Sequence, residues 1–117
     1  MRRRFCRDGD RECRSVWLLV GTDSGVHGVF PGASLHSELR TLVRLGMEPL
    51  AALRAATSRP ADFLDPAATF GRIAPGQRAD LLLVRGDPSI RMEALSEIEE
   101  VLLAGRRLLR TDAPAGG

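Results

Sequence analysis

The spacing of hydrophobic residues changes twice along this chain. Residues 16–20 form a continuous apolar run, which is typical of a strand buried on both faces, as in a parallel sheet. Between residues 34 and 64 the apolar positions recur at helical spacing, and from residue 71 onward short apolar runs alternate with turn residues. The pattern therefore predicts one strand, then two or three helices, then a small β unit.

Two or three helices are predicted in the middle of the chain. The first has Ser34 as its N-cap, ends near Gly46, and places four apolar residues on one face, namely Leu35, Leu39, Leu42 and Val43. Pro49 opens the second helix, because a missing N–H has no cost at the first helical position. Pro60 opens a third, short helix that runs through Leu64 and is broken by Pro66.

Turn residues organise the second half. Pro75-Gly76 suits the two central positions of a type II turn, and residues 81–84 follow as a short strand. A weakly helical stretch covers residues 92–95. Residues 101–103 then form a strand that returns through Leu108 and Leu109 after a turn at Ala104-Gly105. This part of the chain is expected to form a small antiparallel unit.

The chain divides into four segments on this basis. Residues 1–15 are rich in Arg without apolar periodicity, which predicts a disordered or non-homologous leader, and residues 111–117 are expected to fray. Residues 16–70 hold the strand and helices, and residues 71–110 the β unit. One buried strand cannot form a parallel sheet, so its neighbours are expected on another chain or in an absent upstream segment.

Composition excludes several classes of function. The net charge is only +2, and four Phe, one Trp and no Tyr offer little stacking surface for nucleic acid. No apolar run approaches the length of a membrane helix. Met1–Arg4 resembles the start of a signal peptide, but no apolar region follows, and Cys6 and Cys13 lack zinc-ribbon spacing. A cytoplasmic protein with two free thiols is expected.

Asp23 is the first candidate for chemistry. It directly follows the apolar run, where α/β barrels place catalytic groups on short loops. A carboxylate at such a place can bind a metal ion and move a proton between water and a leaving group. The alternative is an ordinary Asx turn, because Asp23 is followed by Ser and Gly.

A series of motifs resembles the last part of the amidohydrolase superfamily. The series comprises Leu18 to Gly25, Glu38-Leu39, Gly46, Pro49, Ala52-Leu53, Ala55 to Thr57, Pro60-Ala61 and Gly71 to Leu81. The resemblance covers about residues 16–110 and is strongest to imidazolonepropionase-like and Xaa-Pro dipeptidase-like members. It implies an α/β fold, in which this chain is the C-terminal part of a (β/α)8 metal-dependent hydrolase barrel plus part of its small β-sandwich.

The same resemblance implies hydrolysis of a C–N bond in a small amide, cyclic amide or peptide-like substrate, with one or two divalent metals, often zinc. Asp23 then matches the Asp that follows the eighth barrel strand, which binds metal and serves as general base and acid. His27 lies in the next loop, where the family places residues that contact substrate; an ordinary flexible loop is the alternative.

The remaining metal ligands of the family are missing from this chain. They are an upstream His-x-His, two further His and, in many members, a carboxylated Lys, whereas this chain has no Lys and both His27 and His36 follow Asp23. We therefore expect a C-terminal fragment that is inactive alone and holds no metal stably. Alternatives are a non-catalytic module that docks on a complementary barrel chain or forms a homo-oligomer, and a truncated gene product.

Four further residues are interpreted as structural. His36 is expected at the edge of the apolar face of the first helix, as a boundary or solvent-facing side chain, and Asp80 at the start of a strand. Ser34 is not a nucleophile, because His36 stands where a nucleophile elbow needs its second Gly. Ala104 is expected to be mildly strained, because its turn position requires a positive φ, where the family usually has Asn.

Overall fold

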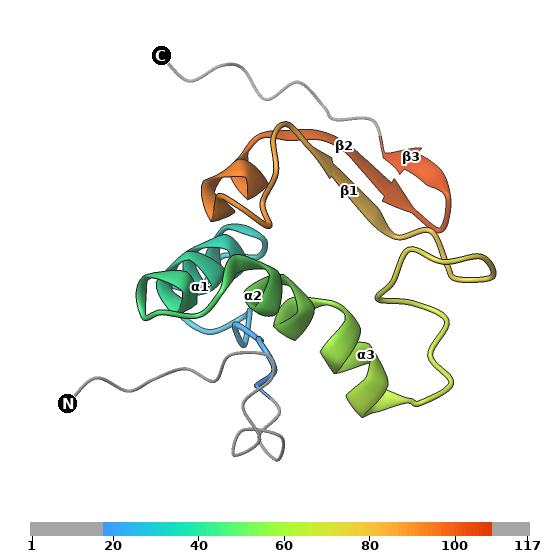
Figure 1. The fold of residues 1–117 in the computed structure, drawn as a ribbon, viewed down its shortest axis with the longest axis horizontal. Helices are drawn as coiled ribbons and strands as arrows, with labels where there is room; N and C mark the ends of the chain where they lie inside the picture. The colour runs from blue at the N-terminus through green and yellow to red at the C-terminus, as the bar shows by residue number, and fades with distance from the viewer. Residues whose placement is uncertain (1–17, 109–117) are drawn as a thin grey trace.

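The computed structural model describes residues 18–108 of the chain, with its helices first and its strands last. Figure 1 shows the helices on one side, the sheet on the other and a 3₁₀ helix between them. The elements are α1 (Ala33–Arg44), α2 (Pro49–Ala56), α3 (Ser58–Leu64), β1 (Leu81–Val84), η2 (Met92–Ser96), β2 (Ile98–Leu103) and β3 (Arg106–Leu108). Within residues 18–108, no helix is long and apolar enough to cross a membrane.

The predicted apolar face of α1 is confirmed, but its predicted N-cap is wrong. Leu39 is buried, and the other three apolar residues of that face pack against the same cluster. Gly32, not Ser34, occupies the N-cap position, and no side chain caps the helix. Ser34 lies in the first turn, where its Oγ accepts a hydrogen bond from the Phe30 N–H at 2.8 Å. The helix begins two residues earlier than predicted, because Gly32, at φ 79°, turns the chain before it.

The second and third helices follow the proline signals with one difference. α2 begins at Pro49 as predicted. α3 begins at Ser58, two residues before the predicted start. Pro60 is thus its third residue, where the helix forms no internal N–H bond and a missing donor has no cost. The Asp65 N–H bonds to the carbonyl of Ala61, and the helix ends before Pro66.

The strand predicted at residues 16–20 is wrong for the residues that the structure describes, since residues 18–20 belong to no strand; Val16 and Trp17 lie outside the described range. In its place, the Val20 N–H donates to the carbonyl of Ala55 in α2 at 3.0 Å. The side chains of Leu18 and Val20 pack on the main apolar cluster. A strand needs a neighbouring strand for its backbone groups, and the described chain offers a helix there.

The β unit is a three-stranded antiparallel sheet with the order β1-β2-β3. Leu82 pairs with Val101, and Val101 pairs with Leu108, so one row of apolar side chains crosses all three strands. The predicted turn before β1 is confirmed, with Gly76 at φ 82° and a hydrogen bond from the Gln77 N–H to Ala74. The predicted β2–β3 hairpin is also confirmed; Leu109, expected to continue β3, lies outside the described residues.

Ala104 has the positive φ expected of it. Its φ is 50° and that of Gly105 is 76°. A two-residue hairpin turn with both central residues at positive φ matches the right-handed twist of the flanking strands. Ala104 has a Cβ that disfavours this conformation, so some strain is built into this turn.

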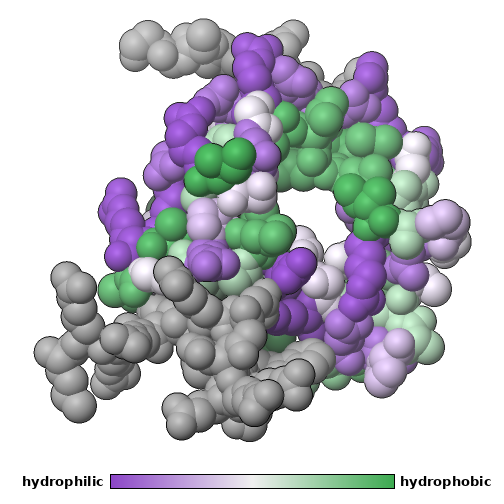
Figure 2. Space-filling model, viewed as in Figure 1, coloured by the Kyte–Doolittle hydropathy of each residue, from purple (hydrophilic) through white to green (hydrophobic). Residues whose placement is uncertain are grey.

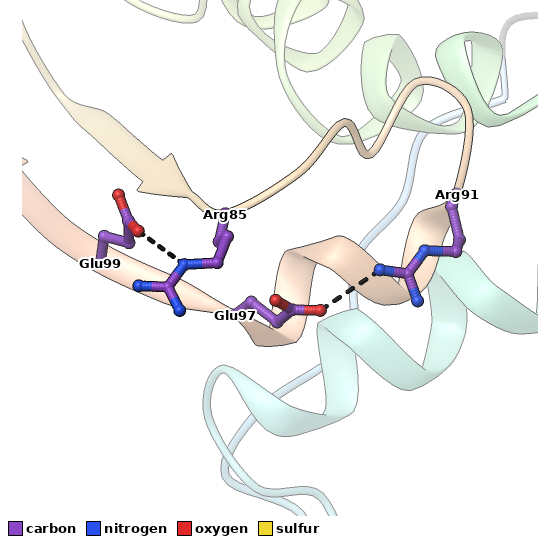
Figure 3. A network of polar contacts seen from close by, with 4 residues as sticks. All are labelled: Arg85, Arg91, Glu97 and Glu99. Atoms are coloured by element: carbon purple, nitrogen blue, oxygen red, sulfur yellow. Dashed lines mark hydrogen bonds and ion pairs between the residues drawn. The ribbon is translucent and has the colours of Figure 1, made fainter.

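Two surface ion pairs lie where the chain passes from β1 through η2 into β2 (Figure 3). Arg85 donates to Glu99 at 3.0 Å, and Arg91 to Glu97 at 3.3 Å. These side chains are exposed, so each pair contributes at most about 1 kcal/mol. The backbone hydrogen bond from Arg85 to Glu97, at 2.8 Å, fixes this connection more firmly.

The main apolar cluster joins the helices to η2. Its buried members come from α1, from the turn between α1 and α2, from α2 and from η2, and they are Leu39, Met47, Ala51, Ala52, Met92 and Leu95. The cluster thus spans the predicted boundary near residue 70, although the segment boundaries themselves stay a prediction. The sheet contacts the helical part through η2 against β1.

The described chain exposes more large apolar side chains than it buries. Six of its ten buried apolar residues are alanines, whereas twelve large ones are exposed, from Val26 to Leu108. The radius of gyration is 15.6 Å, compared with about 13 Å for a compact domain of 100 residues. The core is small because α2 and α3 contribute mostly Ala to it.

Gly71 lies directly against α3 and the residue before it. A Cβ at Gly71 would be 2.7 Å from Ala61 Cβ and 2.9 Å from the Thr57 carbonyl oxygen. Gly28 has the same φ of 85°, but a Cβ there would meet nothing within 4 Å. Comparing an alanine substitution at each of the two glycines therefore distinguishes the free-energy cost of the backbone conformation from the cost of crowding.

Replacing Gly71 by Ala is expected to destabilise the chain more than replacing Gly28 by Ala. The conformation alone costs about 1 to 2 kcal/mol, and crowding adds about 1 to 3 kcal/mol at residue 71. The free energy of unfolding, from urea titrations followed by circular dichroism, measures both. Equal losses in the two variants would contradict the contact between Gly71 and α3.

Candidate functional site

Asp23 lies in the loop between the segment at residues 18–20 and α1. Its φ is 51°, a left-handed conformation that Asp adopts more readily than most residues. The side chain is exposed, and the hydroxyls of its neighbours Thr22 and Ser24 are hydrogen-bonded at 2.9 Å. The loop thus turns sharply at the aspartate and leaves its carboxylate in solvent.

The position of this loop depends on α2. Ala52 and Ala55 are fully buried, with 0% of their surface exposed, so the backbone of residues 18–20 comes close to the helix. The hydrogen bond from Val20 to Ala55 fixes that approach three residues before Asp23. The sequence analysis missed this role of α2, whose alanines at positions 51, 52 and 55 were the available signal.

The Asx-turn alternative for Asp23 finds no support among residues 18–108. Asp65 and Asp87 both form such turns, accepting bonds from the N–H groups of Ala67 at 2.9 Å and Ser89 at 2.8 Å. Asp23 makes no comparable hydrogen bond or ion pair within that range. Its carboxylate is therefore free, within the described chain, to accept a proton or to contribute a metal ligand.

The structure places the two histidines on either side of the start of α1. His27 is exposed in a turn closed by a hydrogen bond from Val29 to Val26 at 3.1 Å, with Gly28 at φ 85°. No hydrogen bond in the described range joins His27 to Asp23, and its substrate role stays a prediction. His36 is half-buried on α1, so its expected place between the buried and the solvent-facing sides of this helix is confirmed.

The residues present do not by themselves fit a catalytic metal. Between residues 18 and 108, no three His, Cys, Asp or Glu side chains come together as a possible metal-binding group. A catalytic zinc site usually takes three protein ligands. Asp23 contributes one carboxylate at most, and Cys6 and Cys13 lie outside the described residues.

Asp80, in contrast, is tied into the fold. Its Oδ1 accepts a hydrogen bond from the Ala104 N–H at 2.8 Å, and its Oδ2 one from Arg78 Nε at 2.6 Å. The Ala104 bond, followed by the Arg78 bond, lowers the pKa of Asp80 below its ordinary range. Asp80 thus holds the strained hairpin turn against the start of β1, which confirms its structural interpretation.

Known proteins are similar to this chain over most of its length. A sequence model described as the amidohydrolase family matches residues 6–108. An adenine deaminase from Moorella thermoacetica is 30% identical over 98 residues, covering 84% of this chain and 16% of the relative. One from Methylobacterium nodulans is 40% identical over 88 residues, covering 68% of this chain and 14% of the relative.

A solved structure agrees with this similarity. The crystal structure of phenylurea hydrolase B superposes with a TM-score of 0.63 at 33% identity, over 68% of this chain and 17% of that one. The chain thus spans about one sixth of the length of the proteins that it matches.

The Asp80 contacts predict a difference in acid stability. Because the folded-state pKa of Asp80 is lowered, its stabilisation is complete above its unfolded pKa of about 4 and is lost as the pH falls through the lower folded value. Asp80→Asn keeps an acceptor for Ala104 but has no charge to lose. Its free energy of unfolding is expected to fall less than that of the wild type between pH 6 and about pH 2.

Glu93→Gln is the matched control for this experiment. The Glu93 carboxylate has no hydrogen-bond or ion-pair partner in the described part of the chain. The control keeps the Asp80 contacts and also those that lower the pKa of Asp62, Asp87 and Glu100. The free energy of unfolding of Glu93→Gln should depend on pH as that of the wild type does. If Asp80→Asn showed the same pH dependence, the contribution of the Asp80 contacts would be disproved.

Proposed function

Because this chain belongs to the amidohydrolase family, we propose that it forms the C-terminal segment of a hydrolase acting on a C–N bond, with Asp23 as a carboxylate of the active site. In this proposal, residues 18–64 lie at the end of a (β/α)8 barrel, and β1–β3 form part of its small β-sandwich. The loop carrying Asp23 then faces the mouth of the barrel, where this fold places its catalytic groups.

The observation that carries the proposal is the exposed, unpartnered carboxylate of Asp23 within residues 18–108. Its side chain is exposed, has no partner in the described range, and follows directly on the contact between Val20 and α2. The excess of exposed large apolar residues also supports a segment that packs against more protein than is described here.

The relatives suggest which bond to test first. Two relatives are adenine deaminases, so the first candidate substrate is a heterocycle that carries an exocyclic C–N bond. Amides, cyclic amides and peptide-like bonds remain the wider class. Imidazolonepropionase-like or Xaa-Pro dipeptidase-like character stays a prediction.

Asp23 would serve as the general base and then as the general acid of the reaction. Its ionised Oδ atoms would accept a proton from the water that attacks the substrate carbon, and the protonated carboxyl would then deliver that proton to the departing nitrogen. The divalent metal expected in the family, zinc by resemblance, needs ligands beyond residues 18–108, and Asp23 is the only one proposed from this chain.

The isolated chain is proposed to be inactive, since it brings one carboxylate to a site that needs several groups. A cytoplasmic location belongs to the same proposal, because Cys6 and Cys13, both outside the described residues, have no pairing framework. A non-catalytic docking module is the alternative, and it requires no role for Asp23.

A chimaera tests the role of Asp23. Residues 18–108 replace the matching segment of the Methylobacterium nodulans relative, and adenine deamination is measured. The wild-type chimaera is expected to be active, and Asp23→Asn to lower kcat/KM by a factor of about 10² to 10⁴, because the acid–base group is lost. Asn tolerates a positive φ, so the loop should keep its conformation.

Glu93→Gln in the same chimaera is the matched control, because it also neutralises one exposed carboxylate. It should retain activity within about a factor of two. Circular dichroism and gel filtration establish that each chimaera folds. An active, folded chimaera that is unaffected by Asp23→Asn would refute the proposed role.

A further inference from the structure

Within residues 18–108, only two residues other than glycine have a positive φ. They are Asp23, at 51°, and Ala104, at 50°. In an L-residue this conformation crowds the Cβ against the backbone, so it persists where other contacts hold it. At Ala104 the holding contact is the hydrogen bond from its N–H to the Asp80 carboxylate. A corresponding restraint is expected at Asp23.

The restraint at Asp23 comes from the residues on either side of it. The hydroxyls of Thr22 and Ser24 share a hydrogen bond of 2.9 Å, which joins the residue before Asp23 to the residue after it. We call this bond the hydroxyl bridge. Thr22 is half-buried, whereas Ser24 is exposed. In the described part of the chain, no other side-chain hydrogen bond involves residues 21–26.

The hydroxyl bridge takes the place of an Asx turn. An aspartate in a turn often accepts a hydrogen bond from the N–H two residues further on, as Asp65 and Asp87 do. For Asp23 that donor is the Gly25 N–H, and this bond is not formed in the described chain. The loop is held by the two hydroxyls instead, so the carboxylate is not needed to hold its own turn.

We infer that Thr22 and Ser24 are positioning residues for the proposed reaction, and that they hold Asp23 through the hydroxyl bridge. This inference rests on the proposed function of Asp23. A general base must lie within hydrogen-bond reach of the attacking water, and a small displacement of such a group slows the reaction steeply. In this role neither hydroxyl takes a proton or contacts the substrate.

Loss of either hydroxyl removes the restraint on Asp23. The residue can then relax to a negative φ, and its carboxylate can accept a hydrogen bond from the Gly25 N–H in an Asx turn. Both changes take the Oδ atoms away from the attacking water. The groups that bind the substrate are not altered, so kcat is expected to fall with little change in KM.

The chimaera with the Methylobacterium nodulans relative is the protein in which this is tested. Figure 2 shows hydrophobic surface that lies open beside an opening in the described chain, and the chimaera surrounds this chain with the rest of an enzyme. Thr22→Val removes one hydroxyl at nearly constant volume, and Ser24→Ala removes the other. Each is expected to lower kcat for adenine about three- to tenfold, because a restraint worth one hydrogen bond shifts the population of the competent loop by about that factor.

The double variant distinguishes one shared bond from two separate roles. Either single change already breaks the hydroxyl bridge, so Thr22→Val combined with Ser24→Ala should lower kcat no further than the single changes do. Thr22→Ser keeps a hydroxyl at this position and should hold kcat within about twofold of the wild-type chimaera. Circular dichroism and gel filtration confirm folding, and Ser24→Ala tests the same bond if Thr22→Val does not fold.

Thr41→Val is the matched control. Thr41 Oγ1 donates to the Ser37 carbonyl in α1, also at 2.9 Å. The control therefore removes the same hydroxyl and a bond of the same length outside the Asp23 loop. It should leave both kcat and KM within about twofold of the wild-type values.

A second measurement on the full chain needs no activity. The NMR scalar couplings of Asp23 that report φ should change in Thr22→Val and in Ser24→Ala, but not in Thr41→Val. Couplings that stay the same in the first two variants would overturn the inference, whether or not the chimaera is active.

Three kinetic results would also overturn it. One is an unchanged kcat in both single variants of a chimaera that Asp23→Asn inactivates. Another is a double variant whose loss in kcat is the product of the single losses, since each hydroxyl would then act on its own. The third is a raised KM at constant kcat, which would make the hydroxyls substrate contacts. The proposed function itself fails on a different result, namely an active chimaera that Asp23→Asn does not affect.

Discussion

The close approach of the loop-bearing segment to α2 is the contact on which the candidate site depends. Ala52 and Ala55 are fully buried, and their small side chains let the backbone of residues 18–20 come near enough for the Val20 N–H to reach the carbonyl of Ala55. A larger side chain there would move this segment outward. Asp23 follows three residues later, so its position is set by helix packing and not by a strand ladder.

The small side chains of α2 also explain why so many large apolar residues are exposed. Because α2 contributes mainly alanine to the core, only a few large residues are buried, among them Leu39 and Met92. Four of the six leucines of the sheet are left exposed, and so are Phe30 and Phe63. A chain of this composition gains stability from further protein packed against those surfaces.

The local elements were largely predictable, because their signals are short-range. Helical spacing gave the buried face of α1, Pro49 gave the start of α2, and Ala104-Gly105 gave the hairpin turn. Capping was mistaken at Ser34, because the conformation of Gly32 decides where α1 starts. The predicted strand at residues 16–20 depended on neighbours that local sequence cannot supply, and the described part of it binds to α2 instead.

The candidate site was predictable only in part. The position of Asp23 after an apolar run, together with the motif series, led to the amidohydrolase family, and the comparisons confirm that family. The sequence did not reveal how α2 positions the loop, because that contact joins residues far apart in the chain. The sequence also could not distinguish Asp23 from the turn-forming Asp65 and Asp87, since all three precede turn-favouring residues and only the structure shows their hydrogen bonds.

The most direct measurement is complementation between two separate chains. The Methylobacterium nodulans relative, shortened by the segment that residues 18–108 match, is mixed with this chain, and adenine deamination is followed. The account predicts that the wild-type chain restores activity and that the Asp23→Asn chain binds the shortened relative without restoring it. Equal restoration by both chains would contradict the assignment of Asp23 to the active site.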